Sequence, residues 1–490
     1  MHDLENTKHS GRFRIGDRWI DGDLDCRGPD TTLRLHDETR FEVADGATIE
    51  GLLSNRVSVT LIGCLPPSGL SAAGASDRLF YYADIFVHHV VAGPRHFDPA
   101  AASVRRLAFI TGDTNIIFHD RSAFGTVHGQ VRDDLFKRLV AEAGRPVEIG
   151  DYAELMYFTG KLEICAVETD IGRLVAEHRP RGRLGSIMGV GISNQVMVTY
   201  APREARCFAD ALDDFLVFLR FFGQLTGRQQ SPTEFLLETS DDDEPWQDWL
   251  RVHWSLRPPR PSPQYGPQPG DLPLQAAKDP EVFGEVLASW VAREATWRTP
   301  RMRLDRVWSQ TRGYDVDRLV SAANMFDILP ASAAPRKVAL TAELETVQQK
   351  ILALLKPLPE SLEKDSLRSA AGRLGSASLK RKVLHCADRL PQGVLDRLPD
   401  LAQVLKEAVD CRNHFVHGSA RRFDYDDGAL VTFFTDALEF VFVAYDLALA
   451  GWSPHWPARG FGGSHPFQAF VSGYDPRLAD LRSRRFTAQP

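Results

Sequence analysis

The hydrophobic residues of this chain change their spacing once, and the change divides the sequence into two parts of different secondary structure. Up to residue 203, apolar side chains come in short runs rich in Val, Ile, Thr, Phe and Tyr, separated by Gly, Asp, Asn and Pro. Such runs predict β-strands. After residue 275, apolar side chains recur at every third or fourth position, which predicts α-helices. We therefore expect an α+β multidomain fold, with a β-rich N-terminal domain followed by an α-helical bundle.

The segment between these parts contains one predicted helix and the strongest linker signal in the chain. Residues 204–227 carry apolar positions at helical spacing and end in a glycine. Residues 256–275 are dense in Pro and Gly, which favours an extended or looping segment. The chain has 490 residues, enough for two or three domains. The predicted division is a sensor or regulatory domain at 1–203, a connecting segment at 204–275 and the helical domain at 276–490.

The composition favours a globular cytoplasmic protein without a cofactor. Hydrophobic residues make up 43% of the chain and charged residues 25%, which is normal for a globular protein. The formal net charge of -7 argues against a nonspecific coat on nucleic acid, but it leaves room for one local basic cleft. The six cysteines include no C-x-x-C pair, and the first residues lack the apolar core of a signal peptide. No stretch approaches the roughly 20 apolar residues of a membrane span, so we expect no membrane contact.

A polar cluster lies where the helical pattern of residues 394–416 ends, in the sequence DCRNHFVHG. At about 100° per residue, Asn413 and His417 are neighbours on one side of the helix, and His414 lies on the same side. Arg412 lies about 140° from His417 on an ideal helix. It therefore reaches the same edge only through its long side chain, or where the last turn loosens.

The cluster permits two interpretations from its residues alone. An imidazole can act as general acid or base, and a guanidinium can stabilise a phosphorane as a 2′-hydroxyl attacks the adjacent phosphate. Together they suit metal-independent RNA cleavage. The other interpretation is the polar end of a helix, where cations interact favourably with exposed carbonyl groups. A metal site built on His414 and His417 lacks a third ligand at ordered spacing, so we expect no metal.

The residues Arg412-Asn413-His414-Phe415-Val416-His417 fit the R-x(4–6)-H signature of HEPN domains, often written R-N-x-x-x-H. The chain resembles, more specifically, the Apea-like HEPN proteins of bacterial anti-phage defence. GRFRIGD…IEGLLSNRVSVTLIGC resembles their β-rich opening domain, and LVSAANMFDILP at 319–330 resembles the helix that begins their HEPN part. RNHFVHG resembles their catalytic loop, and the three segments occur in the order that the family shows.

The resemblance implies a helical-bundle ribonuclease that dimerises, with motifs from two protomers lining one cleft. Arg412 and His417 match the catalytic pair of the family, and Asn413 matches the polar position that supports the pair. The family often has a further polar or acidic residue on an earlier helix, for which Asn324 and Asp327 are the candidates. These two residues share a face of their helix at i, i+3, and the residues alone favour the alternative that both are ordinary polar surface of an amphipathic helix.

Further polar residues near the motif are weaker candidates. Arg421 and Arg422 follow it directly and could contact RNA phosphates, or they could lie in a solvated loop. Lys380 and Arg381 on a predicted helix could do the same, or they could form a plain charged face. His414 is a possible supporting residue without an assigned role.

We therefore expect an anti-phage protein that acts by abortive infection through a C-terminal ribonuclease domain. His417 would act as general acid or base, and Arg412 would stabilise the phosphorane. The expected partners are an RNA substrate, an unknown phage-derived trigger and further copies of the chain in a homodimer or higher homo-oligomer. The alternative is a non-catalytic HEPN-type module that binds a nucleotide or a protein. A degraded module need not keep both Arg412 and His417, so the intact pair favours the nuclease.

Overall fold

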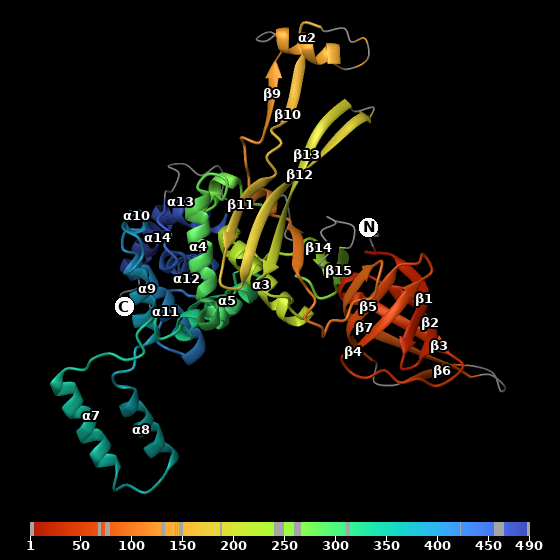
Figure 1. The fold of residues 1–490 in the computed structure, drawn as a ribbon. Coiled ribbons are helices and arrows are strands. Elements are labelled where there is room, and N and C mark those ends of the chain that lie inside the picture. The colour runs from red at the N-terminus through yellow and green to blue at the C-terminus, as the bar shows by residue number, and fades with distance from the viewer. Residues whose placement is uncertain are drawn as a thin grey trace. The chain divides into compact units, whose positions relative to one another are not determined.

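The computed structural model describes residues 4–487 except 67–69, 74–78, 129–132, 143, 145, 147–149, 187–188, 240–248, 259–265, 310–313, 422 and 455–464. The chain forms two compact units, unit 1 at Met1–Val291 and unit 2 at Ala292–Pro490 (Figure 1). Strands dominate unit 1 and helices form unit 2, so the expected α+β fold class is confirmed.

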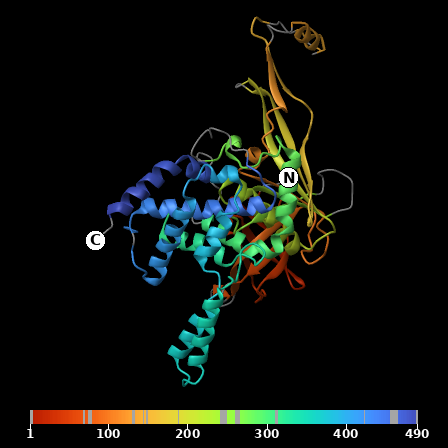
Figure 2. The same cartoon turned by 90° about the vertical axis from the view of Figure 1, so that its left-hand side faces the viewer.

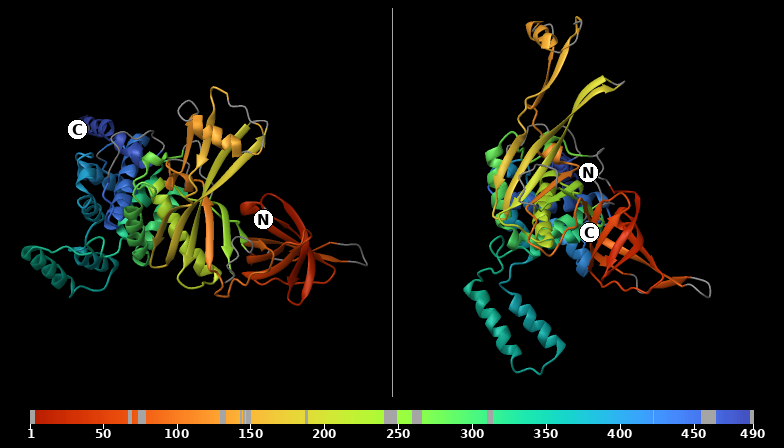
Figure 3. Two further views of the ribbon diagram at one scale, coloured as in Figure 1. Left: turned by 45° about the horizontal axis from the view of Figure 1, so that its top comes forward. Right: turned by 45° about the vertical axis from the view of Figure 1, so that its right-hand side comes forward.

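Unit 1 begins with a closed antiparallel β-barrel of six strands, seen from two directions in Figure 3. The strand β7 closes the barrel because it pairs with β3 along one edge and with β5 along the other. Alternating apolar residues point inward, and Phe13, Leu33 and Leu61 are fully buried there. The six strands, in sequence order, are β1 (Lys8–Ile15), β2 (Arg18–Asp25), β3 (Thr32–Asp37), β4 (Ala47–Leu53), β5 (Ser58–Leu65) and β7 (Phe80–Gly93).

The sheet continues beyond the barrel in the order β11-β12-β13-β8-β14-β15-β7, with every pair antiparallel. These strands are β8 (Arg106–Thr111), β11 (Glu163–Glu168), β12 (Gly172–Ser186), β13 (Gly189–Pro202), β14 (Pro232–Glu238) and β15 (Leu250–Trp254). The short strand β6 (Ser71–Ala73) pairs with β7, and a separate two-stranded sheet joins β9 (Phe124–His128) to β10 (Glu154–Phe158). Unit 1 also contains two short helices, α1 (Thr114–Ile117) and α2 (Asp133–Glu142).

The segment 204–275 does not act as the connector that the sequence predicts. It contains α3 (Phe208–Thr226), together with β14 and β15, all of which belong to unit 1. The reason is the apolar face of α3, since Phe215 stacks on Phe235 of β14 at 4.5 Å and contacts Phe109 of β8 edge-on at 4.9 Å. In turn, α4 (Pro280–Ala292) packs on α3 through aromatic contacts with Phe221.

Unit 2 is a helical bundle around α12 (Gly428–Leu449), and α6, α9, α11 and α13 pack against this helix. Its other helices are α5 (Glu294–Ser309), α6 (Val316–Asp327), α7 (Ala342–Leu355), α8 (Leu362–Arg373), α9 (Leu379–Ala387), α10 (Gln392–Leu395), α11 (Leu401–His417), α13 (Pro466–Ser472) and α14 (Tyr474–Thr487). Among the described residues, α12 is the one helix long and apolar enough to span a membrane, but it is mostly buried inside the bundle. Its apolar surface is therefore explained by the core.

Local backbone geometry sets where several helices begin and end. A turn at Arg293 separates α4 from α5. The helix α11 begins at Leu401, because Asp400 adopts a left-handed backbone with φ of 54° and does not continue the helix backwards. Gly375, with φ of 89°, lies between α8 and α9.

The core helix α12 carries three buried carboxylates, Asp436, Glu439 and Asp446, that tie it to other helices of unit 2. Asp446 binds Arg301 of α5 through Nε at 2.8 Å and Nη2 at 2.9 Å. Glu439 accepts two bonds from Arg318 of α6, at 2.8 and 2.9 Å. A buried carboxylate is costly unless it is paired, so these contacts fix the rotation of α12 in the bundle.

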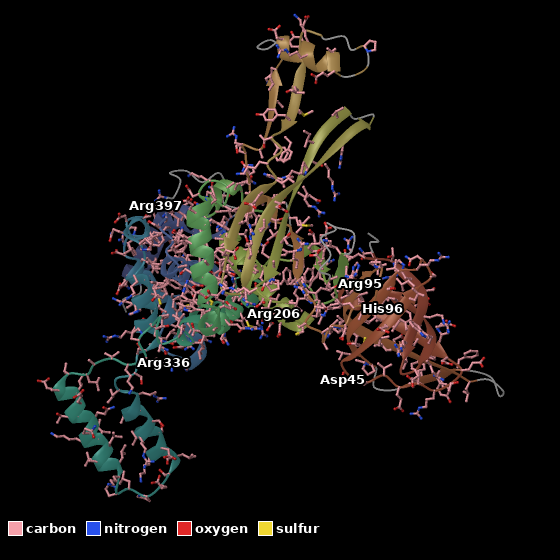
Figure 4. All side chains as sticks on the ribbon, in the orientation of Figure 1. Asp45, Arg95, His96, Arg206, Arg336 and Arg397 are labelled. Atoms are coloured by element: carbon pink, nitrogen blue, oxygen red, sulfur yellow. The ribbon has the colours of Figure 1, made fainter. Side chains whose placement is uncertain are left out.

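The helices α7 and α8 form a hairpin that projects from the rest of unit 2 (Figure 2). They pack extensively only against each other among the described elements. Arg336 lies at the base of the hairpin, where Lys337 and Ser376 form a short β-bridge between its two connections (Figure 4). The polar cluster lies on α11, which contacts α6, α9 and α12. The hairpin of α7 and α8 is separate from this group of helices.

Candidate active site

The predicted cluster lies at the C-terminal end of α11. The apolar stripe of this helix, with Val404, Leu405 and Ala408, is fully buried. The helix ends at Gly418, whose φ of 68° is in the left-handed region that glycine adopts most easily. The helix α11 contacts α6, α9 and α12, and near its C-terminal end Asp410 pairs with Lys380 of α9. The site is therefore placed by the bundle core.

Arg412 and His417 meet although they lie on different sides of the helix. Arg412 Nη1 is 3.2 Å from His417 Nε2 and 3.1 Å from Asn413 Oδ1. The long arginine side chain spans the 140° that separates the two Cα positions on an ideal helix. A guanidinium can only donate, so His417 accepts at Nε2 and carries its ring proton at Nδ1.

The second guanidinium nitrogen of Arg412 is fixed by another helix. Its Nη2 donates to Oδ1 of Asn324, on α6, at 2.8 Å. Its Nε is buried and has no hydrogen-bond partner in the described part of the chain. The structure therefore brings Arg412, His417, Asn413 and Asn324 together in one protomer, and it leaves one buried donor of the guanidinium unused.

The partners of Arg412 differ in charge from those of other arginines in unit 2. Its three acceptors are two amide oxygens and a ring nitrogen, and no described carboxylate pairs with it. By contrast, the buried Arg301 faces the carboxylate of Asp446, and the half-buried Arg318 faces that of Glu439. Arg412 thus keeps an uncompensated positive charge, which attracts an anion.

His414 takes a structural position beside the site. Its Nδ1 lies 2.7 Å from the carbonyl oxygen of Ser419, and its Nε2 accepts from Arg421 Nε at 3.0 Å. Arg421 also pairs with Asp426 at 3.0 Å. The ring of His414 further contacts Tyr425, which is fully buried. Through these bonds, His414 and Arg421 stabilise the loop that follows α11.

The remaining predicted residues divide between ion pairs and open surface. Asp327 pairs with Lys382 at 3.1 Å and is not in contact with Arg412. Lys380 of α9 pairs with Asp410 of α11 at 2.6 Å, so its charge is largely neutralised. Arg381 is exposed on α9. Sequence spacing carries no signal that Lys380 and Asp410 pair, since 30 residues separate them.

The described residues of this site include neither a reactive thiol nor a cluster that could bind a metal. Burial raises the pKa of the Cys411 thiol to about 12, so that it stays protonated at neutral pH. In the residues that the structure describes, no group of three or more His, Cys, Asp or Glu side chains could hold a metal ion. Arg422, a predicted RNA contact, lies outside the described residues.

Comparison with known proteins gives one match. Residues 320–455 match the model of a family described as Apea-like HEPN. The match includes α9, α11 and α12 and contains Asn324, Arg412 and His417. Searches among curated proteins and among solved structures found no match to the chain.

Proposed function

Since residues 320–455 form an Apea-like HEPN domain, we propose that the protein is a metal-independent RNA endonuclease of anti-phage defence. In this proposal, Arg412 and His417 form the catalytic pair, while Asn413 and Asn324 orient Arg412. The enzyme acts on cytoplasmic RNA during infection and stops phage growth at the cost of the host cell. The N-terminal unit restrains the nuclease until a phage-derived trigger appears, because a constitutively active ribonuclease would be toxic.

The charge state around Arg412 supports the proposal most directly. Burying a guanidinium halfway without a carboxylate partner costs free energy, and a bound anion that neutralises the charge removes this cost. The neutral amide oxygens of Asn324 and Asn413 hold the guanidinium in place without neutralising it. A phosphate of the RNA backbone supplies two oxygens that match the fork of an arginine. The unused buried Nε adds a third donor for that phosphate.

The proposed reaction begins when a phosphate draws Arg412 away from His417. The ring nitrogen Nε2 of His417 is then free to take the proton of the ribose 2′-hydroxyl. The 2′-oxygen forms a bond to phosphorus, and Arg412 stabilises the extra negative charge of the phosphorane. The bond to the 5′-oxygen breaks, and protonated His417 returns its proton to that oxygen. The products are a 2′,3′-cyclic phosphate and a 5′-hydroxyl.

The same proposal specifies the substrate and the assembly. DNA is not cleaved because it lacks the attacking hydroxyl. No metal takes part in the reaction, since the 2′-hydroxyl is activated by His417. The active form is a homodimer or higher homo-oligomer in which two copies of the site line one cleft, as in the family that the domain belongs to.

An assay on the end groups of the products tests this function. The purified chain is incubated with mixed-sequence RNA or the matching DNA in EDTA, and the new ends are analysed. We expect 2′,3′-cyclic phosphate ends from RNA and no cleavage of DNA. Phage protection in cells should be lost with Arg412→Ala. Cleavage that requires a divalent ion, or Arg412→Ala cells that stay protected, would contradict the proposal and favour the non-catalytic binding module.

A further inference from the structure

The β12–β13 hairpin of unit 1 carries three closely spaced arginines on one strand. Arg179, Arg181 and Arg183 alternate along β12, so the three side chains point to the same face of the hairpin. Residues 178–203 contain no Asp or Glu, in a chain with a net charge of -7. The hairpin is therefore locally positive, although the whole chain has a negative net charge.

The outer part of this hairpin is a two-stranded ribbon. Beyond Glu177 on β12 and Val198 on β13, the two strands pair only with each other among the described strands. Figure 1 shows both strands extending past their neighbours in the sheet. Arg181 pairs across the ribbon with Ser193, and Arg183 pairs with Gly191. The small partners leave the arginine face open to close approach by a large ligand.

The outer two arginines are free for such a ligand. Arg179 is near a carboxylate, since its Nη1 lies 3.8 Å from Glu234. Arg181 and Arg183 are exposed, and neither has an ion pair with any described residue. In the barrel of the same unit, two exposed arginines at the same spacing are paired instead, Arg12 with Asp21 and Arg14 with Glu50. Unpaired charge is thus a property of the ribbon and not of exposed strands in general.

We propose that this arginine ribbon binds the phosphate backbone of double-stranded DNA by entering its major groove. The major groove of B-form DNA admits a two-stranded β-ribbon, whereas that of A-form RNA is too deep and narrow. Residues two apart on a strand lie about 7 Å from each other, so Arg181 and Arg183 contact separate phosphates. The ligand is thus a polyanion whose phosphates are regularly spaced. This inference does not rest on the nuclease proposed for unit 2.

Fluorescence anisotropy with the full chain and a short labelled DNA duplex tests the inference over a series of salt concentrations. The ribbon variant is Arg181→Gln/Arg183→Gln, and the matched control is Arg12→Gln/Arg14→Gln, which removes the same charge at the same spacing from paired arginines. We expect the ribbon variant to bind DNA roughly tenfold more weakly near physiological salt and its slope of log K against log salt to fall by about 1.8. The control should bind like the parent chain.

Any one of four results would overturn the inference. The first is a parent chain that does not bind the duplex at low salt, and the second is an equal loss in both double variants, which would indicate net charge alone. The third is a ribbon variant that keeps its DNA affinity but loses binding to anionic phospholipid vesicles, which would make a membrane surface the ligand. An RNA duplex bound as tightly as the DNA duplex would contradict insertion into the major groove. Unchanged circular dichroism and melting temperatures establish that both variants are folded.

Discussion

Arg412 Nη1 lies 3.2 Å from His417 Nε2, on the same helix and five residues away. This hydrogen bond occupies the lone pair that His417 would use as a base. The same guanidinium is held by Asn324 from α6, so the pair is positioned by tertiary structure and not by α11 alone. In the proposed mechanism this is the resting site, and an anion that binds the guanidinium releases His417 as the base.

Replacement of Arg412 by lysine should cost almost as much activity as replacement by alanine. A lysine keeps the charge but lacks the planar fork of donors. Its single ammonium group cannot bind Asn324, Asn413 and a phosphate at the same time. We expect RNA cleavage to slow by roughly 10²–10³-fold in both variants, the scale for loss of a transition-state donor. Initial rates in EDTA measure this, with Arg397→Lys as control, because Arg397 is exposed and precedes the opposite end of α11 from the motif. A lysine variant with parental activity would show that only charge matters there.

The charge of the residue at position 324 should matter as well as its hydrogen bond. Asn324→Ala removes the acceptor for Nη2, and we expect the rate to fall by about tenfold to 100-fold through misplacement of the guanidinium. Asn324→Asp keeps the acceptor but gives Arg412 a counter-ion, so the KM for RNA should rise more than in Asn324→Ala. Steady-state kinetics separate the two effects. An aspartate variant that binds RNA as well as the parent would contradict the importance of the uncompensated charge.

Burial of Asp436 should make the stability of the protein depend on pH. Burial raises the pKa of this carboxyl from its ordinary value of 3.8 to about 6, although Arg477 and Tyr314 partly oppose the shift. The folded protein therefore binds more protons than the unfolded chain between these values, and stability falls as pH rises through that window. The expected loss is roughly 3 kcal/mol across the whole titration, of which about 2 kcal/mol falls between pH 4 and pH 6, from 1.36 kcal/mol per pKa unit.

Melting temperatures of the parent chain and of Asp436→Asn at several pH values measure this effect. Asparagine does not titrate, so the parent should lose stability relative to the variant as pH rises to about 6, and the difference should then level off. A difference that is independent of pH, or that grows in favour of the parent as pH rises, would contradict the assignment.

Loss of the buried carboxylate at Asp446 should destabilise the protein strongly. Asp446 is fully buried and pairs with Arg301 and Arg293 at 2.8–2.9 Å. Asp446→Asn leaves two guanidinium groups inadequately paired, and we expect a loss of about 3–5 kcal/mol. The matched control is Asp426→Asn, because Asp426 is exposed and its surface pair with Arg421 should contribute about 1 kcal/mol or less. Thermal or denaturant unfolding compares them, and equal effects would contradict the structural role of the buried pair.

The sequence carried the local features of the site but not its long-range contacts. The periodicity of α11 and the glycine after His417 predicted a helix with its polar cluster at the C-terminal end, and the structure has the helix ending there. Helical geometry also indicated that Arg412 points away from His417, and only the length of the side chain overcomes this. The bond from Arg412 to Asn324 joins residues 88 positions apart, and spacing within one helix cannot reveal such a contact.

The same limit applies to the fold. Strand-like runs predicted a β-rich first half, yet the closed barrel depends on β7 pairing with both β3 and β5. The Pro-rich stretch suggested a linker before residue 276, whereas the compact units divide after Val291. Local composition marked a turn-rich segment there, but the aromatic packing of α3 and α4 that keeps this segment in unit 1 is a tertiary effect.

The most direct test of the central claim compares two histidines of unit 2 in one RNA-cleavage assay with EDTA. His417 is the proposed acid and base, while His385 on α9 also sits 3.0 Å from an arginine, Arg389, but outside the site. We predict that His417→Ala slows cleavage by about 10²–10⁴-fold, the scale of general acid–base catalysis, and that His385→Ala cleaves like the parent. If His417→Ala cleaves RNA at the parental rate, the proposed active site is wrong.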